Sequence, residues 1–268
     1  MAKASKQQKV NPARVQAKTI KEITLTFTDF NFEKWYPFII ALFGLLLYAN
    51  TLTHDYVLDD ETVMAKNKIV TKGVSAIPEI MLTAYRAGSQ DRQESLYRPL
   101  SVVMFAIEWQ LSPNKPFLGH LINMLLYALT GFLLYKLLRK WFPDKHSFVL
   151  FAISFLFMAH PLHTEVVANI KSRDEILGLL FAILSFNAFY EYAAKNNIKQ
   201  VLLGTVYFFL AMLSKESTVT LAAAIPLSLF FFTKMEDNKK YMYSIAALIV
   251  GVVLYFILRK AAIGGLVT

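Results

Sequence analysis

Seven long apolar runs constrain this chain more than any other feature of its sequence. Most of them approach the roughly 20 residues that an α-helix needs to cross the hydrocarbon core of a bilayer. Hydrophobic residues make up 56% of the chain, and their grouping into runs is typical of a multi-spanning membrane protein. We predict an all-α polytopic membrane protein with about seven transmembrane helices, at residues 35–52, 117–138, 147–162, 174–193, 200–213, 218–233 and 241–258.

The basic residues set the expected orientation. The chain carries 28 Lys and Arg against 19 Asp and Glu, a net charge of +9. In a membrane protein such an excess indicates cytoplasmic loops rather than nucleic-acid binding, so no nucleic acid is expected as a partner. Residues 1–34 form a basic tail, and the connectors after the second, fourth and sixth runs carry Arg139, Lys140 and Lys145, then Lys195 and Lys199, then Lys234, Lys239 and Lys240. The positive-inside rule therefore predicts a cytoplasmic N-terminus.

Residues 53–116 are expected to form a large first extracytoplasmic loop. Its most apolar part, from Pro99 to Leu111, contains Glu108 and is too short to span a bilayer. We interpret it as one of several short interfacial helices in this loop, with Pro99 in the first turn. With this parity, the loop, the segment 160–175 and the motif SKES at 214–217 all face the extracytoplasmic side.

The loop begins with an acidic pair, Asp59 and Asp60. Adjacent carboxylates can raise each other's pKa, and one of them could act as a general base toward a substrate hydroxyl. Two neighbouring acids are a weak signal, and a solvated turn is the competing interpretation.

The segment HPLHTEVVANIKSRDE, residues 160–175, places ionisable groups beside apolar runs, where they are costly and therefore indicate a functional site. His160 and His163 could share one helical face, but no third ligand is evident and the chain has no cysteine, so a metal site is not expected. We expect His163 and Glu165 to line a polar cavity and Arg173 to bind an anion. A carboxylate such as that of Glu175 is also favoured at a helix N-terminus by the helix dipole.

SKES contains the remaining candidates, Lys215 and Glu216. A lysine at a membrane boundary can simply extend its ammonium toward water. On the extracytoplasmic side, where basic residues are scarce, Lys215 could instead hold a lipid-linked phosphate.

Five motifs in order resemble the membrane portion of the transmembrane and tetratricopeptide-repeat O-mannosyltransferases and their bacterial relatives. They are LDDE at 58–61, YRPL at 97–100, GHLIN at 119–123, HPLHTEVVANIKSRDEIL at 160–177 and SKES at 214–217. These proteins belong to the GT-C superfamily of polyprenyl-phosphate-dependent glycosyltransferases. The resemblance covers roughly residues 36 to 264 and implies a GT-C-like transmembrane domain over 35–268. The family also carries further spans and helical repeats, so we expect either a fragment, truncated at its C-terminus, or a reduced form.

The resemblance also implies roles for individual residues. Asp59 or Asp60 takes the place of the catalytic acid of the first outer loop. Where the family usually has Arg-Ala-Asp, this chain has Arg173, Asp174 and Glu175, which leaves open which acid of the two matters. Lys215 and Glu216 match a Lys-Glu pair near the donor. The site is framed by Arg98, His160, His163, Glu165 and Arg173.

The function that the resemblance implies is transfer of a hexose such as mannose from a polyprenyl-phosphate donor, with inversion, to a hydroxyl of an acceptor protein or glycan. The reaction would take place on the outer face of a bacterial inner membrane or in the endoplasmic reticulum. No cofactor is assigned, and a divalent cation stays open. A flippase or transporter for a lipid-linked sugar is disfavoured because the centres of the runs are apolar, and a non-catalytic membrane scaffold is the other alternative.

Overall fold

The computed structural model describes residues 32–89, 95–233 and 238–264. The expected basic tail therefore lies almost entirely outside the described residues. The chain divides into two units, Met1–Tyr36 and Pro37–Thr268. In the first unit the description covers residues 32–36, with the short helix η1 (Phe32–Trp35). All other elements discussed below belong to the second unit, apart from the first residue of α2.

All regular secondary structure of the described residues is helical, with no strand among them, as the sequence predicts. The fold class is confirmed to that extent. In chain order the helices after η1 are α2 (Tyr36–Leu47), η2 (Ala49–Thr53), α3 (Asp59–Val63), η3 (Val70–Ala76), α4 (Ile77–Ile80), α5 (Pro99–Leu111), α6 (Pro116–Trp141), α7 (Ser147–Met158), α8 (His163–Ala168), η4 (Ile170–Ser172), α9 (Arg173–Lys195), α10 (Ile198–Ser214), η5 (Glu216–Thr220), α11 (Leu221–Phe232) and α12 (Asn238–Ile263).

Among the described residues, four helical segments are long and apolar enough to cross a membrane: Phe32–Thr53, Pro116–Trp141, Ile170–Lys195 and Asn238–Ile263. Three further apolar helices, α7, α10 and α11, coincide with expected spans but are shorter. The predicted helices are thus present, while the number of spans stays a prediction. The helix expected over 147–162 ends at Met158, because the chain turns at His160 and Pro161 before α8 begins.

Local sequence explains where the long helices begin and end. Pro116 starts α6, where a missing N–H has no cost, and Arg139 and Lys140 lie in its last turn, where the helix dipole favours cations. Helix α9 has Asp174 and Glu175 in its first turn and ends at Lys195, because the next residue, Asn196, adopts a left-handed backbone conformation.

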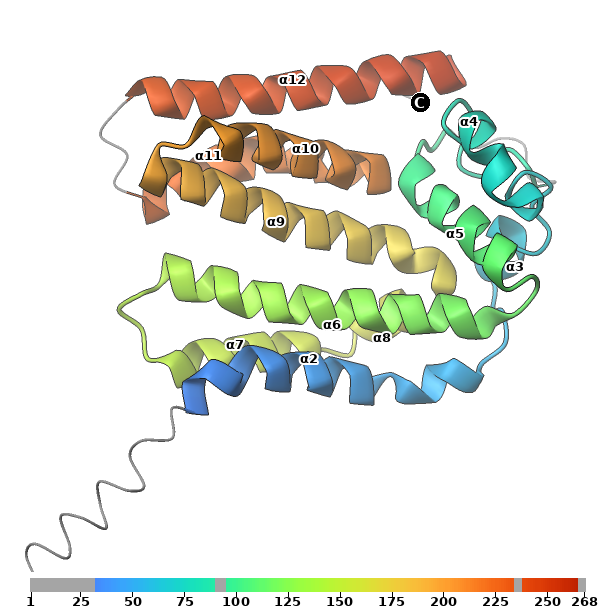
Figure 1. Cartoon of the computed structure of the whole chain (residues 1–268), viewed down its shortest axis with the longest axis horizontal. Helices are drawn as coiled ribbons and strands as arrows, with labels where there is room; N and C mark the ends of the chain where they lie inside the picture. The colour runs from blue at the N-terminus through green and yellow to red at the C-terminus, as the bar shows by residue number, and fades with distance from the viewer. Residues whose placement is uncertain (1–31, 90–94, 234–237, 265–268) are drawn as a thin grey trace, which may run out of the picture. The chain divides into compact units, whose positions relative to one another are not determined.

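The long helices pack side by side, with α6 against α9, α9 against α10, and α10 against α12 (Figure 1). Glycines permit two of these close approaches. A Cβ on Gly204 would lie 2.8 Å from the ring of Phe189, and one on Gly251 would lie 2.8 Å from the ring of Phe208. Much of the outward surface of α12 is apolar and about half exposed, as a lipid-facing helix requires.

The described part of the first loop packs at one end of the long helices, where α3, α4 and α5 lie together (Figure 1). Its buried side chains include Val63, Val70 and Phe105, and Ile170 of η4 packs into the same cluster. The loop is therefore an ordered platform that places Asp59, Asp60 and Arg98 beside the start of α9.

Candidate functional site

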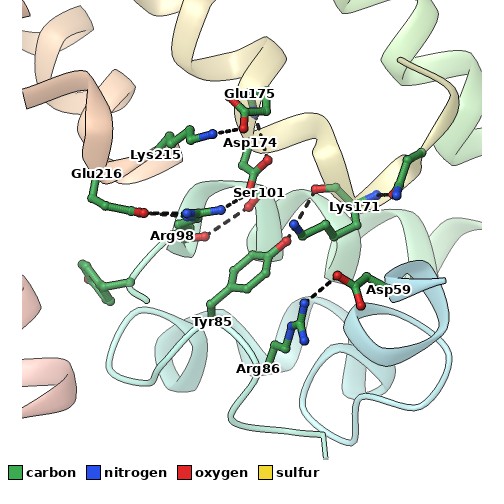
Figure 2. A network of polar contacts seen from close by, with 12 residues as sticks. Asp59, Tyr85, Arg86, Arg98, Ser101, Lys171, Asp174, Glu175, Lys215 and Glu216 are labelled. Carbon is green, nitrogen blue, oxygen red and sulfur yellow. Dashed lines mark hydrogen bonds and ion pairs between the residues drawn. The ribbon is translucent and has the colours of Figure 1, made fainter. Parts of the chain in front are cut away.

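Arg98 is the centre of the polar network in Figure 2. It precedes Pro99 at the start of α5, and its side chain is 10% exposed. Its Nη1 donates to Asp174 at 2.6 Å, while Nε and Nη2 donate to the two carboxylate oxygens of Glu216 at 2.8 and 2.5 Å. The guanidinium also lies 5.7 Å from the ring centre of Tyr85. Three segments that are distant in the sequence, α5, α9 and η5, therefore meet at one cation.

Lys215 extends this network. It follows α10 directly and forms an ion pair with Glu175, whose side chain is 42% exposed. Burial lowers the pKa of Lys215, although the nearby charges of Asp174 and Glu216 oppose the shift. Burial alone would raise the pKa of Glu216, but its hydrogen bonds to Arg98 outweigh that effect and lower it. Lys215 and Glu216 of the SKES motif therefore both lie near the acidic start of α9: Lys215 pairs with Glu175, and Glu216 shares Arg98 with Asp174.

The two aspartates of the first loop have different surroundings. Asp60 is fully buried and accepts hydrogen bonds from the backbone N–H of Lys171, at 2.7 Å, and of Val57, at 3.2 Å. Burial raises the pKa of Asp60, while these amide bonds act in the opposite direction. Asp59 is 44% exposed and accepts a 2.7 Å hydrogen bond from Arg86. Through Asp60, the acidic pair contacts the segment before α9.

Arg173 is enclosed, with no exposed surface. Its Nε donates to Asn123 at 2.8 Å, its two terminal nitrogens pair with both oxygens of Glu108, and Nη2 also donates to the carbonyl of Gly119 at 3.0 Å. Every nitrogen of this guanidinium already has a partner. Here the guanidinium of Arg173 binds the carboxylate of Glu108, and the expectation that Arg173 binds a substrate anion stays a prediction.

The histidines of the 160–175 segment lie apart from Arg98. The hydroxyl of Tyr127 donates to the carbonyl of Met158 at 2.8 Å and lies 2.8 Å from Nδ1 of His163. Burial, with a smaller effect of His160, lowers the pKa of His163. A neutral ring whose Nδ1 donates to Tyr127 satisfies both contacts. His160 and Glu165 are exposed, and the described part of the chain brings no three His, Asp or Glu side chains together as a metal site.

Sequence reasoning missed several polar residues around these motifs. Glu108 and Asn123 serve Arg173, and Arg86 serves Asp59. His120 is fully buried with neither ring nitrogen hydrogen-bonded, although the backbone of His54 and Asp55 lies beside it. The signal for Glu108 and His120 was present in the sequence, because each is an ionisable residue within an apolar run.

Comparisons with known proteins identify the family of this chain. The family model described as dolichyl-phosphate-mannose-protein mannosyltransferase matches residues 99–257. Protein O-mannosyl-transferase TMTC3 of Homo sapiens is 29% identical over 177 residues, which cover 65% of this chain and 19% of that protein. Protein O-mannosyl-transferase F38B6.6 of Caenorhabditis elegans is 29% identical over 70% of this chain and 27% of its own length. No solved structure was found to match.

The matches cover only a small part of each relative. Tmtc1 of Drosophila melanogaster is 24% identical, and the match covers 66% of this chain but 20% of that protein. The chain therefore spans between about a fifth and about a quarter of the length of these relatives. On the side of this chain the family match covers more than half of the residues and includes three of the long apolar helices in whole or in large part. The chain is thus an integral membrane protein that belongs to the dolichyl-phosphate-mannose-protein mannosyltransferase family of GT-C glycosyltransferases.

Proposed function

We propose that this chain carries the catalytic centre of a membrane glycosyltransferase. It moves a hexose such as mannose from a polyprenyl-phosphate donor to a hydroxyl of an acceptor protein or glycan, with inversion, on the extracytoplasmic side. The observation that carries the proposal is the joining of Arg98, Lys215 and the acidic start of α9 next to the acidic pair of the first loop.

The leaving group of such a transfer is a lipid phosphate, and its developing charge requires cations. Arg98 and Lys215 are suited to that task, because guanidinium and ammonium groups form strong charge-assisted hydrogen bonds with phosphate oxygens. Lys215 is the more readily released of the two, since its partner Glu175 is 42% exposed. An exposed ion pair contributes little to stability, so a phosphate can replace Glu175 at low cost.

The acceptor hydroxyl needs a base. We assign this role to Asp59, because it is the half-exposed member of the acidic pair, whereas Asp60 is sealed against the backbone of Lys171 and Val57. Tyr85 and Arg86 link the proposed phosphate-binding cation to the proposed base. The ring of Tyr85 packs against the guanidinium of Arg98, and the next residue, Arg86, donates a hydrogen bond to Asp59. Asp60 then acts as a positioning residue that ties the loop to the segment before α9.

The remaining predicted residues have supporting places in this proposal. Asp174 and Glu216 orient Arg98, and the buried pair of Arg173 and Glu108 fixes the start of α9. His160, His163 and Glu165 lie on and beside α8, which contacts both α6 and α9. We assign them to binding of the acceptor or the sugar.

The test is sugar transfer by the purified chain in lipid nanodiscs, with polyprenyl-phosphate mannose as donor and a serine- and threonine-rich peptide as acceptor. We expect labelled mannose on the peptide, and much less with Arg98→Ala. Lys199→Ala, which removes an exposed cation from the first turn of α10, is the matched control and should transfer normally. Donor movement across sealed vesicles without any transfer would instead identify a lipid-linked sugar transporter.

A further inference from the structure

Arg259 is a buried cation that no motif of the sequence singled out. It lies near the end of α12, and it is 7% exposed. Its Nη2 donates to the carbonyl of Ser95 at 2.8 Å, and its Nε is buried without a hydrogen-bond partner. Within residues 32–89, 95–233 and 238–264, no Asp or Glu forms an ion pair with it. A guanidinium in this state is unusual, because buried charges are normally paired.

The position of Arg259 places it at the site rather than elsewhere along α12. Ser95 is three residues before Arg98, and Tyr97 directly precedes Arg98. One turn before Arg259, the hydroxyl of Tyr255 lies 3.3 Å from the carbonyl of Tyr97. The Tyr255 hydroxyl also contacts Arg259, and the charges of Arg98 and Glu216 are near enough to act on the same hydroxyl. Helix α12 thus delivers a third cation to the network of Arg98 and Lys215.

The three cations differ in what an incoming anion must displace. Arg98 holds Asp174 and Glu216, and Lys215 holds Glu175. Among the described residues, Arg259 contacts only neutral groups, the carbonyl oxygen of Ser95 and the hydroxyl of Tyr255, and the carbonyl groups at the end of α12 supply partial negative charge. Because no described carboxylate pairs with Arg259, a phosphate that approaches it gains a charge-assisted hydrogen bond without displacing any ion pair of the described residues.

We propose that Arg259 is a phosphate-binding residue of this site, which contacts a phosphate oxygen through its unpaired Nε edge. The ligand class is a phosphate ester or free phosphate, and this inference rests on the proposed use of a lipid-phosphate donor. In the transfer, Arg259 holds the phosphate of the donor and of the lipid-phosphate product alike. It is thus a binding residue rather than the base or the acid.

The experiment measures binding of three probes to the intact chain in nanodiscs: a polyprenyl phosphate, inorganic phosphate and the uncharged polyprenol. The variants are Arg259→Gln, Arg259→Lys and, as the matched control, Lys260→Gln, which removes the same charge from the exposed neighbouring residue. We expect Arg259→Gln to weaken polyprenyl phosphate binding by about tenfold or more, because one strong charge-assisted hydrogen bond is lost. Arg259→Lys should lose less, Lys260→Gln should bind like the parent, and polyprenol binding should be equal in all four proteins.

Three results would contradict phosphate binding by Arg259 or distinguish it from the proposed lipid donor. If Arg259→Gln is folded and binds polyprenyl phosphate like the parent, Arg259 only ties α12 to Ser95, and the inference fails. If Arg259→Gln does not fold, the Arg259→Lys variant tests the inference instead. A folded Arg259→Lys protein with full affinity for both phosphate probes would contradict specific phosphate binding by the guanidinium. If the parent binds inorganic phosphate in an Arg259-dependent way but not polyprenyl phosphate, the phosphate site stands and the lipid donor of the proposed function fails.

Discussion

Arg98 and Glu216 meet through two hydrogen bonds, of 2.8 and 2.5 Å, although 118 residues separate them in the chain. The pair closes the first loop onto the turn between α10 and α11, and Arg98 reaches Asp174 of α9 from the same position. One guanidinium therefore connects three segments that the sequence marked separately. The strength of that connection can be measured.

Arg98→Ala should destabilise the protein more than Glu216→Gln does. Removing Arg98 leaves Asp174, which is 1% exposed, without its cation, and breaking a buried pair typically costs about 3–5 kcal/mol. Glu216→Gln leaves the bond of Arg98 to Asp174 intact, so its loss should be smaller. Denaturant unfolding in detergent measures both free energies, and equal stability of Arg98→Ala and the parent would contradict the network.

Glu108→Gln should lower the stability of the protein without lowering its affinity for the donor. The change leaves the fully buried guanidinium of Arg173 without a carboxylate, so we expect a loss of about 3–5 kcal/mol in the free energy of unfolding. Affinity for the lipid donor should stay within about twofold of the parent, because Arg173 faces Glu108 and not the phosphate. A large loss of donor affinity in the folded Glu108→Gln variant would instead indicate that Arg173 takes part in binding the donor phosphate.

Donor binding should depend on pH through Lys215. Burial lowers its pKa below the usual 10.5, so the ammonium loses its proton, and the phosphate loses a cation, as the pH rises through that lowered value. Lys215→Arg should keep its charge and carry donor binding to higher pH, since a guanidinium does not deprotonate in this range. Binding titrations at increasing alkaline pH measure the shift, and superimposable profiles for parent and variant would exclude Lys215 from the phosphate site.

The orientation can be tested with single cysteines, because the chain has none of its own. Leu58 is 83% exposed in the first loop, and Asp144 is exposed in the basic connector after α6. With a cytoplasmic N-terminus, Leu58→Cys should react with a membrane-impermeant reagent added outside, and Asp144→Cys should not. Labelling in the reverse pattern would invert the topology.

The helices could be predicted from the sequence because apolar runs and terminal residues act locally. The run predicted at 117–138 lies within α6, which begins at Pro116. Arg139 and Lys140, expected in the connector, form part of the last turn of the helix. The end of α7 was placed too late, because Ala159, Pro161 and Leu162 continue the apolar pattern while the backbone already turns. The number of spans depends on how the shorter helices lie in lipid, which neither the pattern nor the helix lengths decide.

The motifs of the site could be found from the sequence, but their pairings could not. Arg173 and Arg98 are both arginines beside apolar helices, and only the fold shows that one is enclosed by Glu108 while the other joins Asp174 and Glu216. Such choices depend on contacts between segments that are distant in the chain. The same reason hid Arg259, whose closeness to Ser95 spans 164 residues.

The most direct test of the central claim compares Asp59→Asn with Asp60→Asn in sugar transfer and donor binding. If Asp59 is the base, Asp59→Asn should lower the transfer rate by about 10²- to 10⁴-fold while donor affinity and stability stay near those of the parent. Asp60→Asn should mainly lower stability, because it weakens the tie to Lys171. Transfer at the parent rate by Asp59→Asn would contradict the account and leave Asp59 as a solvated partner of Arg86.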